Sequence, residues 1–123
     1  NGMTLPEEYR TPAFLYSLVD TYGRMYSGHE GTLCLNISYD APFDNISYII
    51  MNYLETRIFS LIGPNSTVLP FEKNKILLFL AKDDRKEKEQ PIRSLLGLFG
   101  DLLSVEEIAR HSHLDLFKLI SAS

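Results

Sequence analysis

Apolar residues recur along the chain with two different periods, and these periods divide it into helices and strands. Helical spacing up to about Tyr26 predicts a first helix. It begins either at Pro6, capped by Thr4, or at Pro12, capped by Thr11, because proline suits the first turn and a hydroxyl suits the cap. A polar, glycine-flanked turn at 28–31 then separates this helix from the next element.

The middle of the chain predicts a strand, a helix and a hairpin. Residues 32–39 form the strand, and its continuously apolar first half is typical of a strand covered on both faces. A helix capped by Asp44 or Asn45 runs through Leu61 with a broad apolar face. Two short strands come next at 67–71 and 76–81, joined by a loop at 72–75, and Pro70 indicates an edge strand or a bulge.

The last third predicts two helices. The charged stretch 82–90 is interpreted as a solvated loop and first helical turn, and an apolar-faced helix runs from Pro91 to about Leu102. Ser104 with Glu106 and Glu107 is typical of a helix cap and predicts a last helix from Val105 to about Ile120.

The resulting order, α-β-α-β-β-α-α, predicts a single α+β domain over residues 1–123, with 104–123 as a C-terminal helix. A β-α-β crossover followed by a hairpin favours an antiparallel sheet of the ferredoxin-like type, with helices packed on it. The length of 123 residues suits one domain, and 45% hydrophobic residues supply enough apolar surface for a core.

Charge and composition exclude several classes of function. The net charge is −4 and the pI is near 5.3, which disfavours contact with nucleic-acid backbones. An RNA-binding domain of ferredoxin-like type is a further alternative, disfavoured by this charge and by the lack of aromatic residues predicted to be exposed on the strands. No apolar run is long enough to cross a bilayer, so we expect a cytoplasmic segment without membrane insertion.

Reactive and metal-binding residue types are sparse. Cys34 is the only cysteine, and its apolar neighbours predict a buried core residue. His111 and His113 are two residues apart, and on a helix that spacing points them to different faces, so no metal site is expected there. Asp40, Asp44 and Glu55 could form a carboxylate cluster, although turn and cap roles explain the first two more simply.

The layout resembles the GGDEF domain of diguanylate cyclases. The similarity is carried by Arg10-Thr11-Pro12-Ala13-Phe14, by the strand Leu33-Cys34-Leu35-Asn36-Ile37-Ser38, and by the hairpin from Glu72 to Ala81. The family has an Arg-x-x-Phe helix opening, a strand written L-D-I-D, and the signature G-G-D-E-F before an apolar strand. The resemblance covers roughly Arg10 to Leu103 and implies a nucleotide-cyclase palm. The family also places a strand near the last predicted helix, and the helix either replaces that strand or packs on the domain.

The chain departs from the family at the positions that the resemblance implies should hold metal. Asn36 stands at the acidic position of the strand, and Asn74 and Lys75 stand at the acidic positions of the hairpin. Mg²⁺ prefers anionic oxygen ligands, and phosphoryl transfer needs the metal to neutralise developing charge. Glu72 and Lys73 replace the signature glycines, and the Arg-x-x-Asp motif that precedes the signature in the family is missing. The resemblance therefore implies a domain that is not an enzyme and needs no cofactor.

Two roles remain for such a domain. The first is a regulatory or protein-interaction module of a longer signalling protein, with a protein partner or a second copy as its ligand. The second is a sensor that keeps a small ligand in the vestigial cleft, with a nucleotide as the disfavoured candidate. The residues that would line this cleft are Asn36, Ser38, Asp44, Asn74 and Lys75.

Overall fold

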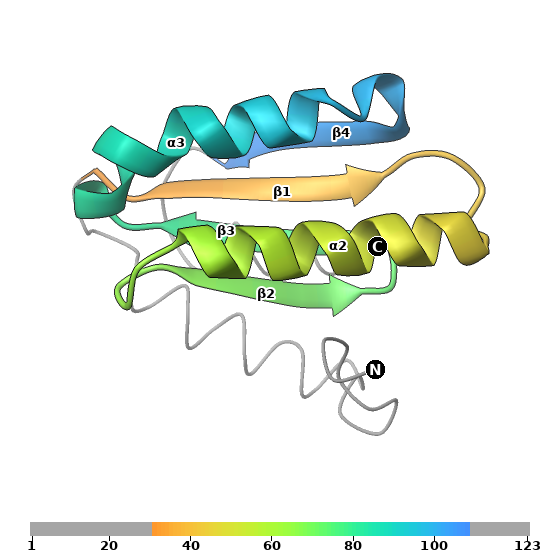
Figure 1. The fold of residues 1–123 in the computed structure, drawn as a ribbon, viewed down its shortest axis with the longest axis horizontal. Coiled ribbons are helices and arrows are strands. Elements are labelled where there is room, and N and C mark those ends of the chain that lie inside the picture. Colours follow the sequence, from red (N-terminus) through yellow and green to blue (C-terminus); the bar gives the residue numbers. More distant parts are fainter. Residues whose placement is uncertain (1–30, 109–123) are drawn as a thin grey trace.

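The computed structural model of the chain describes residues 31–108, which form a four-stranded antiparallel sheet with two α-helices packed against it (Figure 1). The predicted α+β class is thereby confirmed, while the predicted first helix lies outside the described residues. Strands are ordered β2-β3-β1-β4 across the sheet. Along the chain the elements are β1 (Leu33–Tyr39), α2 (Asn45–Leu61), β2 (Thr67–Glu72), β3 (Lys75–Leu80), α3 (Lys82–Gly97), the 3-10 turn η2 (Gly100–Leu102) and β4 (Leu103–Ile108).

Strand β1 is central, and its neighbours on both sides run antiparallel to it. Ile37, for example, pairs with Ile76 of β3 and with Val105 of β4. Every second residue of β1 faces α2 and α3, which lie on the same side of the sheet (Figure 1). The core between the helices and the sheet consists of Leu33, Leu35, Ile37, Tyr39, Met51, Leu54, Ile58, Ile76, Leu78, Leu80, Ile92, Leu96 and Leu103.

Helix α2 begins as predicted, with Asp44 as its cap. The Ser47 amide donates to Asp44 Oδ1 at 2.9 Å, and the Asp44 amide donates to Ser47 Oγ at 3.0 Å. This reciprocal pair satisfies two backbone donors that a helix start leaves without intrahelical partners. The helix ends at Leu61, also as predicted.

A polar clasp joins the end of α2 to the start of α3. Asp84 Oδ2 accepts from the Gly63 amide at 3.0 Å, and the same carboxylate accepts from the hydroxyl of Ser66. Ser66 Oγ in turn accepts from the Ala81 amide at 2.9 Å. A Cβ at position 63 would come within 2.9 Å of Asp84 Oδ1, so a larger residue there would force the Asp84 side chain to shift.

The β2–β3 hairpin is confirmed, with a turn of only two residues, Lys73 and Asn74. β2 is an edge strand of the described sheet, and its register with β3 shifts between Pro70 and Glu72. Both interpretations of Pro70 were right, because a proline without an amide hydrogen is tolerated where the ladder is open or interrupted.

Helix α3 begins earlier than predicted. Residues 82–90 are its first half, not a solvated loop before it, and Pro91 lies inside the helix at an exposed position. The charged residues are spaced so that they pair along the helix: Glu89 Oε1 accepts from Arg85 Nε at 2.8 Å, and Glu89 Oε2 accepts from Arg93 Nε at 3.1 Å. Such i,i+4 pairs stabilise a helix that has few apolar residues. The helix also ends earlier than predicted, at Gly97.

The predicted helix from Val105 is wrong over the described residues, where the chain forms strand β4. Leu103 is buried against the core, and β4 pairs with β1 from Leu103 to Ile108. A central strand such as β1 has backbone donors and acceptors on both edges. β3 hydrogen-bonds to one edge of β1, and β4 hydrogen-bonds to the other. The rest of that predicted helix lies outside the described residues.

Candidate functional site

Three of the five predicted cleft residues share the face of the sheet that points away from α2 and α3. In β1, Asn36 and Ser38 alternate with the core residues and so lie on this second face. Lys75 of β3 pairs directly with Ser38 of β1. On the other side of β1, Glu106 pairs with Asn36 and Ser104 pairs with Ser38, so a polar strip crosses three strands.

Asn36 is the most unusual member of this strip because it is buried. Its side chain is 7% exposed, and its Oδ1 has no hydrogen-bond partner. Buried polar atoms in proteins are nearly always paired, since an unpaired one costs its full desolvation free energy. An ionised carboxylate at this position would cost far more than the amide does, so the environment of Asn36 favours a neutral side chain.

The hairpin turn closes over the end of β1. The Tyr39 amide donates to the Asn74 carbonyl at 2.8 Å, and Asn74 Nδ2 donates back to the Tyr39 carbonyl at 3.4 Å. The ammonium of Lys73 lies 5.3 Å from the centre of the Phe43 ring, a cation–π contact. The turn therefore packs against the loop after β1, and Asn74 holds this corner together through its side chain.

Asp44 lies apart from the other four predicted cleft residues. It caps α2, a helix that packs on the opposite face of the sheet from Asn36 and Ser38. The hydrogen bonds that Asp44 accepts from Ser47 lower the pKa of its carboxyl below the usual value. Its carboxylate is therefore occupied by the helix start, and the structure gives it a cap role.

The other candidate metal-binding and reactive residues do not form a site within residues 31–108. Asp40 is exposed at the end of β1 and Glu55 is buried on α2, and within residues 31–108 no group of three or more His, Cys, Asp or Glu is placed to hold a metal ion. Cys34 is buried as predicted, and burial raises the pKa of its thiol to about 12. At neutral pH it is a protonated, unreactive thiol. His111 and His113 lie outside the described residues.

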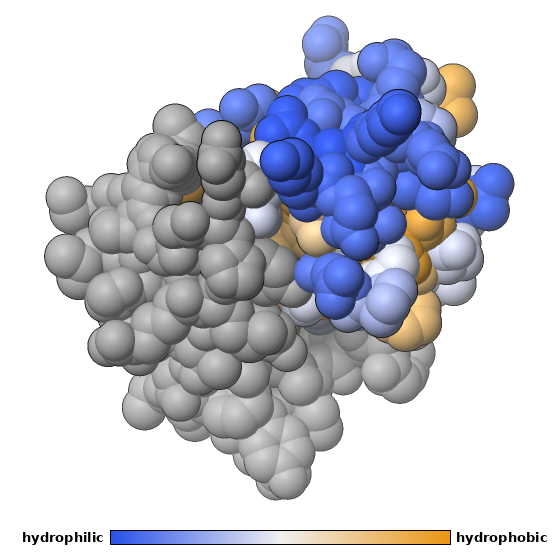
Figure 2. All heavy atoms as spheres, turned by 90° about the vertical axis from the view of Figure 1, so that its left-hand side faces the viewer, coloured by the Kyte–Doolittle hydropathy of each residue, from blue (hydrophilic) through white to orange (hydrophobic). Residues whose placement is uncertain are grey.

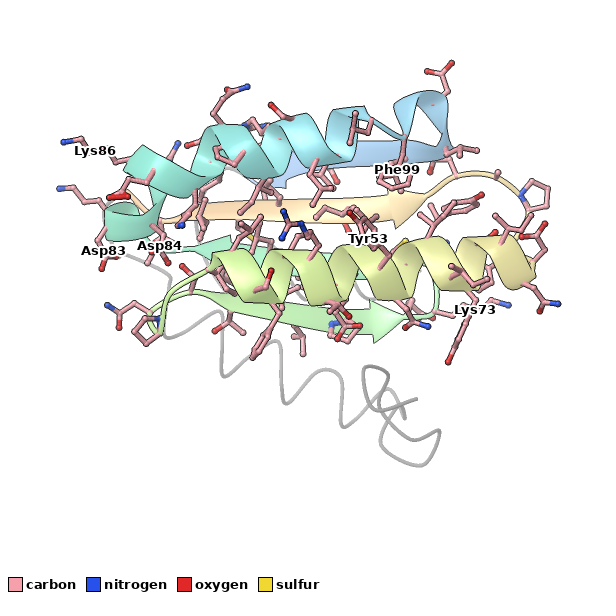
Figure 3. The ribbon with its side chains drawn as sticks, in the orientation of Figure 1. Tyr53, Lys73, Asp83, Asp84, Lys86 and Phe99 are labelled. Carbon is pink, nitrogen blue, oxygen red and sulfur yellow. The ribbon has the colours of Figure 1, made fainter. Side chains whose placement is uncertain are left out.

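A surface that the sequence interpretation missed lies on the outside of α2. Five large apolar side chains of this helix are exposed to solvent: Ile46, Tyr48, Ile49, Tyr53 and Phe59. Ile46, Ile49 and Tyr53 are three and four residues apart and share one side of the helix, which we call the α2 outer surface, whereas Tyr48 and Phe59 lie on a different side. Tyr53 also contacts Phe99, which lies just after α3, with ring centres 6.5 Å apart (Figure 3). The signal was present in the sequence, because apolar residues occupy more of α2 than one buried face requires.

The outside of α3 is built from the opposite kind of residue. Figure 2 looks at the end of the molecule where α3 begins, and hydrophilic residues cover the upper part of that view. Asp83, Asp84 and Lys86 are at this end (Figure 3). Neither described helix is long and apolar enough to cross a membrane.

Comparisons of the chain with protein-family models, with curated proteins and with solved structures each found no match. The residues and their geometry therefore carry the functional inference.

Proposed function

We propose that the chain is a catalytically inactive GGDEF-like domain that acts as a regulatory or protein-interaction module in signalling. The observation that carries this proposal is the α2 outer surface, where Ile46 is 63% exposed, Ile49 65% and Tyr53 50%. Scattered exposed apolar residues are ordinary, but a cluster on one helix is typical of a binding surface.

The arrangement of the sheet supports the GGDEF-like part of the proposal. The described elements follow one another as β-α-β-β-α-β, and the strand order β2-β3-β1-β4 places β1 in the centre. This is the order expected of a ferredoxin-like palm. The resemblance implies that Asn36 and Lys75 stand where carboxylates would be needed, and these two residues lie on one face of neighbouring strands.

Loss of catalysis follows from the same two positions. An amide offers a metal ion only a neutral oxygen, and the Lys75 ammonium brings positive charge to a place where a divalent cation needs negative charge. The burial of Asn36 adds a second obstacle, because a group that is 7% exposed has little room for hydrated metal and triphosphate. The chain's own residues thus favour binding of another protein over phosphoryl transfer.

Photo-crosslinking tests the interaction role. A benzophenone amino acid is introduced in place of Tyr53 or, as the matched control, in place of Lys86 on the charged outside of α3, in the cells that make the protein. We expect a discrete adduct from position 53, with its partner identified by peptide mapping, and none from position 86. Either a second copy or a different protein in that adduct supports the role, and no adduct from position 53 contradicts it.

A separate assay tests the loss of catalysis. Purified protein incubated with GTP and Mg²⁺ or Mn²⁺ is expected to form no cyclic dinucleotide, measured by chromatography against an active diguanylate cyclase. Measurable turnover would overthrow this half of the proposal without affecting the crosslinking result.

A further inference from the structure

The α2 outer surface lacks the charged residues that usually keep a helix exposed. Within Asn45–Leu61 the only charged side chains are Glu55, which is 8% exposed, and Arg57. The exposed positions are otherwise apolar or neutral. Large apolar side chains gathered on one exposed side of a helix are typical of a binding surface, so the outside of α2 is suited to a partner.

The size of the surface matches that of a small specific interface. A fully exposed large apolar side chain presents on the order of 200 Å², and the three side chains of the α2 outer surface are between 50% and 65% exposed. Together they present on the order of 350 Å² of apolar area. The smallest specific interfaces bury roughly 600 Å² per partner, of which about three-fifths is apolar. One such surface on each of two molecules is therefore enough.

The centre of the surface contains side chains suited to anchor an interface. Ile46, Ile49 and Tyr53 recur at helical spacing and form one stripe along α2. Phe99, in the turn that follows α3, contacts Tyr53 and is itself partly packed on the core. A half-exposed aromatic ring that already rests on a second ring loses little conformational freedom on binding, and tyrosines of this kind often contribute most to affinity.

The distribution of charge along α2 favours a second copy of this chain as the partner. Exposed acidic residues, Asp40 and Asp44, lie next to the start of the helix, and the exposed Arg57 lies near its end. In an antiparallel pair of α2 helices the centre of the stripe lies close to Ile49, so Arg57 of each copy meets the acidic end of the other. A parallel pair would place like charges together, which costs free energy.

We infer that two copies of this chain associate through antiparallel packing of their α2 helices about a twofold axis near Ile49. The inference rests on the proposed interaction role and names the partner. A twofold interface is self-complementary, so one surface supplies both halves. Ile49 and Tyr53 are buried against the other copy, and Arg57 pairs with the carboxylate of Asp40.

Sedimentation equilibrium of the purified chain measures this association. We expect a monomer–dimer equilibrium in the unaltered protein. Ile49→Glu should raise the dissociation constant at least about 30-fold, the loss typical of a residue at the centre of an interface. The matched control Gln90→Glu adds the same charge at an exposed position of α3 and should change the constant by less than about twofold.

A second variant guards against a folding defect. Arg57 is exposed, and Arg57→Glu leaves the apolar stripe intact. This variant should raise the dissociation constant of the dimer about fivefold, and the increase should be smaller at high salt. Urea unfolding of each variant checks that the fold is retained. A protein that stays monomeric at all concentrations, or a dimer that Ile49→Glu leaves unchanged, overturns the inference. If crosslinking from position 53 still gives an adduct with a different protein, the interaction role survives and only the second copy is excluded.

Discussion

Helices α2 and α3 pack on the same face of the same sheet, yet their outer faces differ completely. Toward the sheet they are alike, since Leu54 and Ile58 of α2 and Ile92 and Leu96 of α3 are all buried in one core. Toward solvent, α3 exposes many charged residues, whereas α2 exposes large apolar residues beside neutral ones. The inner faces thus account for the fold. The outer faces distinguish α3, whose charged side is suited to solvent, from α2, whose apolar side is suited to an interface.

The outside of α3 shows how a helix with few apolar residues is made stable in water. Arg85, Glu89 and Arg93 form consecutive ion pairs, and Arg93 Nη2 donates to Glu107 Oε1 of β4 at 3.2 Å. The hydrogen bond from Arg85, with smaller contributions from Arg93, lowers the pKa of Glu89 below its usual value. Among residues 31–108 no comparable set of ion pairs covers the outside of α2, where Arg57 is the only exposed charge of the helix.

The largest expected effect tests whether the inner faces are equivalent. Ile58→Ala in α2 and Ile92→Ala in α3 each remove a side chain that is 0% exposed. Each should lower the free energy of unfolding by about 2–5 kcal/mol, because a cavity replaces buried methyl groups. Urea unfolding at low protein concentration measures both. A loss below about 1 kcal/mol in only one of them would mean that the two helices do not share one core.

A smaller effect concerns the second face of the sheet, which neither described helix covers. Asn36→Leu removes an amide with an unpaired oxygen and should leave stability unchanged or raise it by up to about 1 kcal/mol. Asn36→Asp should cost about 3 kcal/mol at pH 7, because it buries an uncompensated charge.

The pH dependence of Asn36→Asp distinguishes charge from shape. Burial raises the folded pKa of such an aspartate above its unfolded value, so the unfolded state loses its proton first as the pH rises. The penalty should therefore vanish below the unfolded pKa and grow as pH rises toward neutrality. A penalty that is the same at pH 3 and pH 7, read from urea midpoints, would assign the effect to packing.

The smallest effect tests the ion pairs of α3. Glu89→Gln should lower stability at pH 7 by less than about 1 kcal/mol, because the pairs are partly exposed and screened by water. The folded pKa of Glu89 is lowered, so its contribution is present above the unfolded pKa and is lost as pH falls through the folded value. The matched change Arg57→Gln on α2 should leave the stability of the monomer unaltered. Equal losses from both changes would contradict the contrast between the helices.

Sequence patterns predicted the elements whose signals are local. The cap at Asp44, the end of α2, strand β1 and the bulged edge strand with Pro70 all follow from residue types at fixed spacing, and all are confirmed. The error at 82–90 arose because a run of charges is typical of solvated loops, while the i,i+4 pairing of Arg85 and Glu89 was the signal for a helix.

The remaining features depend on partners that are distant in sequence. β4 forms because one edge of β1 would otherwise lack a hydrogen-bonded neighbour. The cap-like residues around Ser104 give no sign of this pairing with a strand that is distant in sequence. The burial of Asn36 and the exposure of Ile49 likewise follow from which face each element turns to the sheet. Of the predicted cleft, the resemblance grouped Ser38 with Lys75, and these two residues pair between β1 and β3, but Asp44 caps a helix on the other face.

Disulfide trapping tests the central claim, that the outside of α2 is an interface, most directly. Cysteines form a disulfide when their Cα atoms lie within roughly 7 Å, as residues beside a twofold axis do. Under mild oxidation Ile49→Cys should yield a covalent dimer and Lys86→Cys on α3 should not. Cys34 is buried, so the unaltered protein should form no disulfide and should run as a monomer on a denaturing gel. No covalent dimer from Ile49→Cys, or equal yields from both variants, would contradict the account.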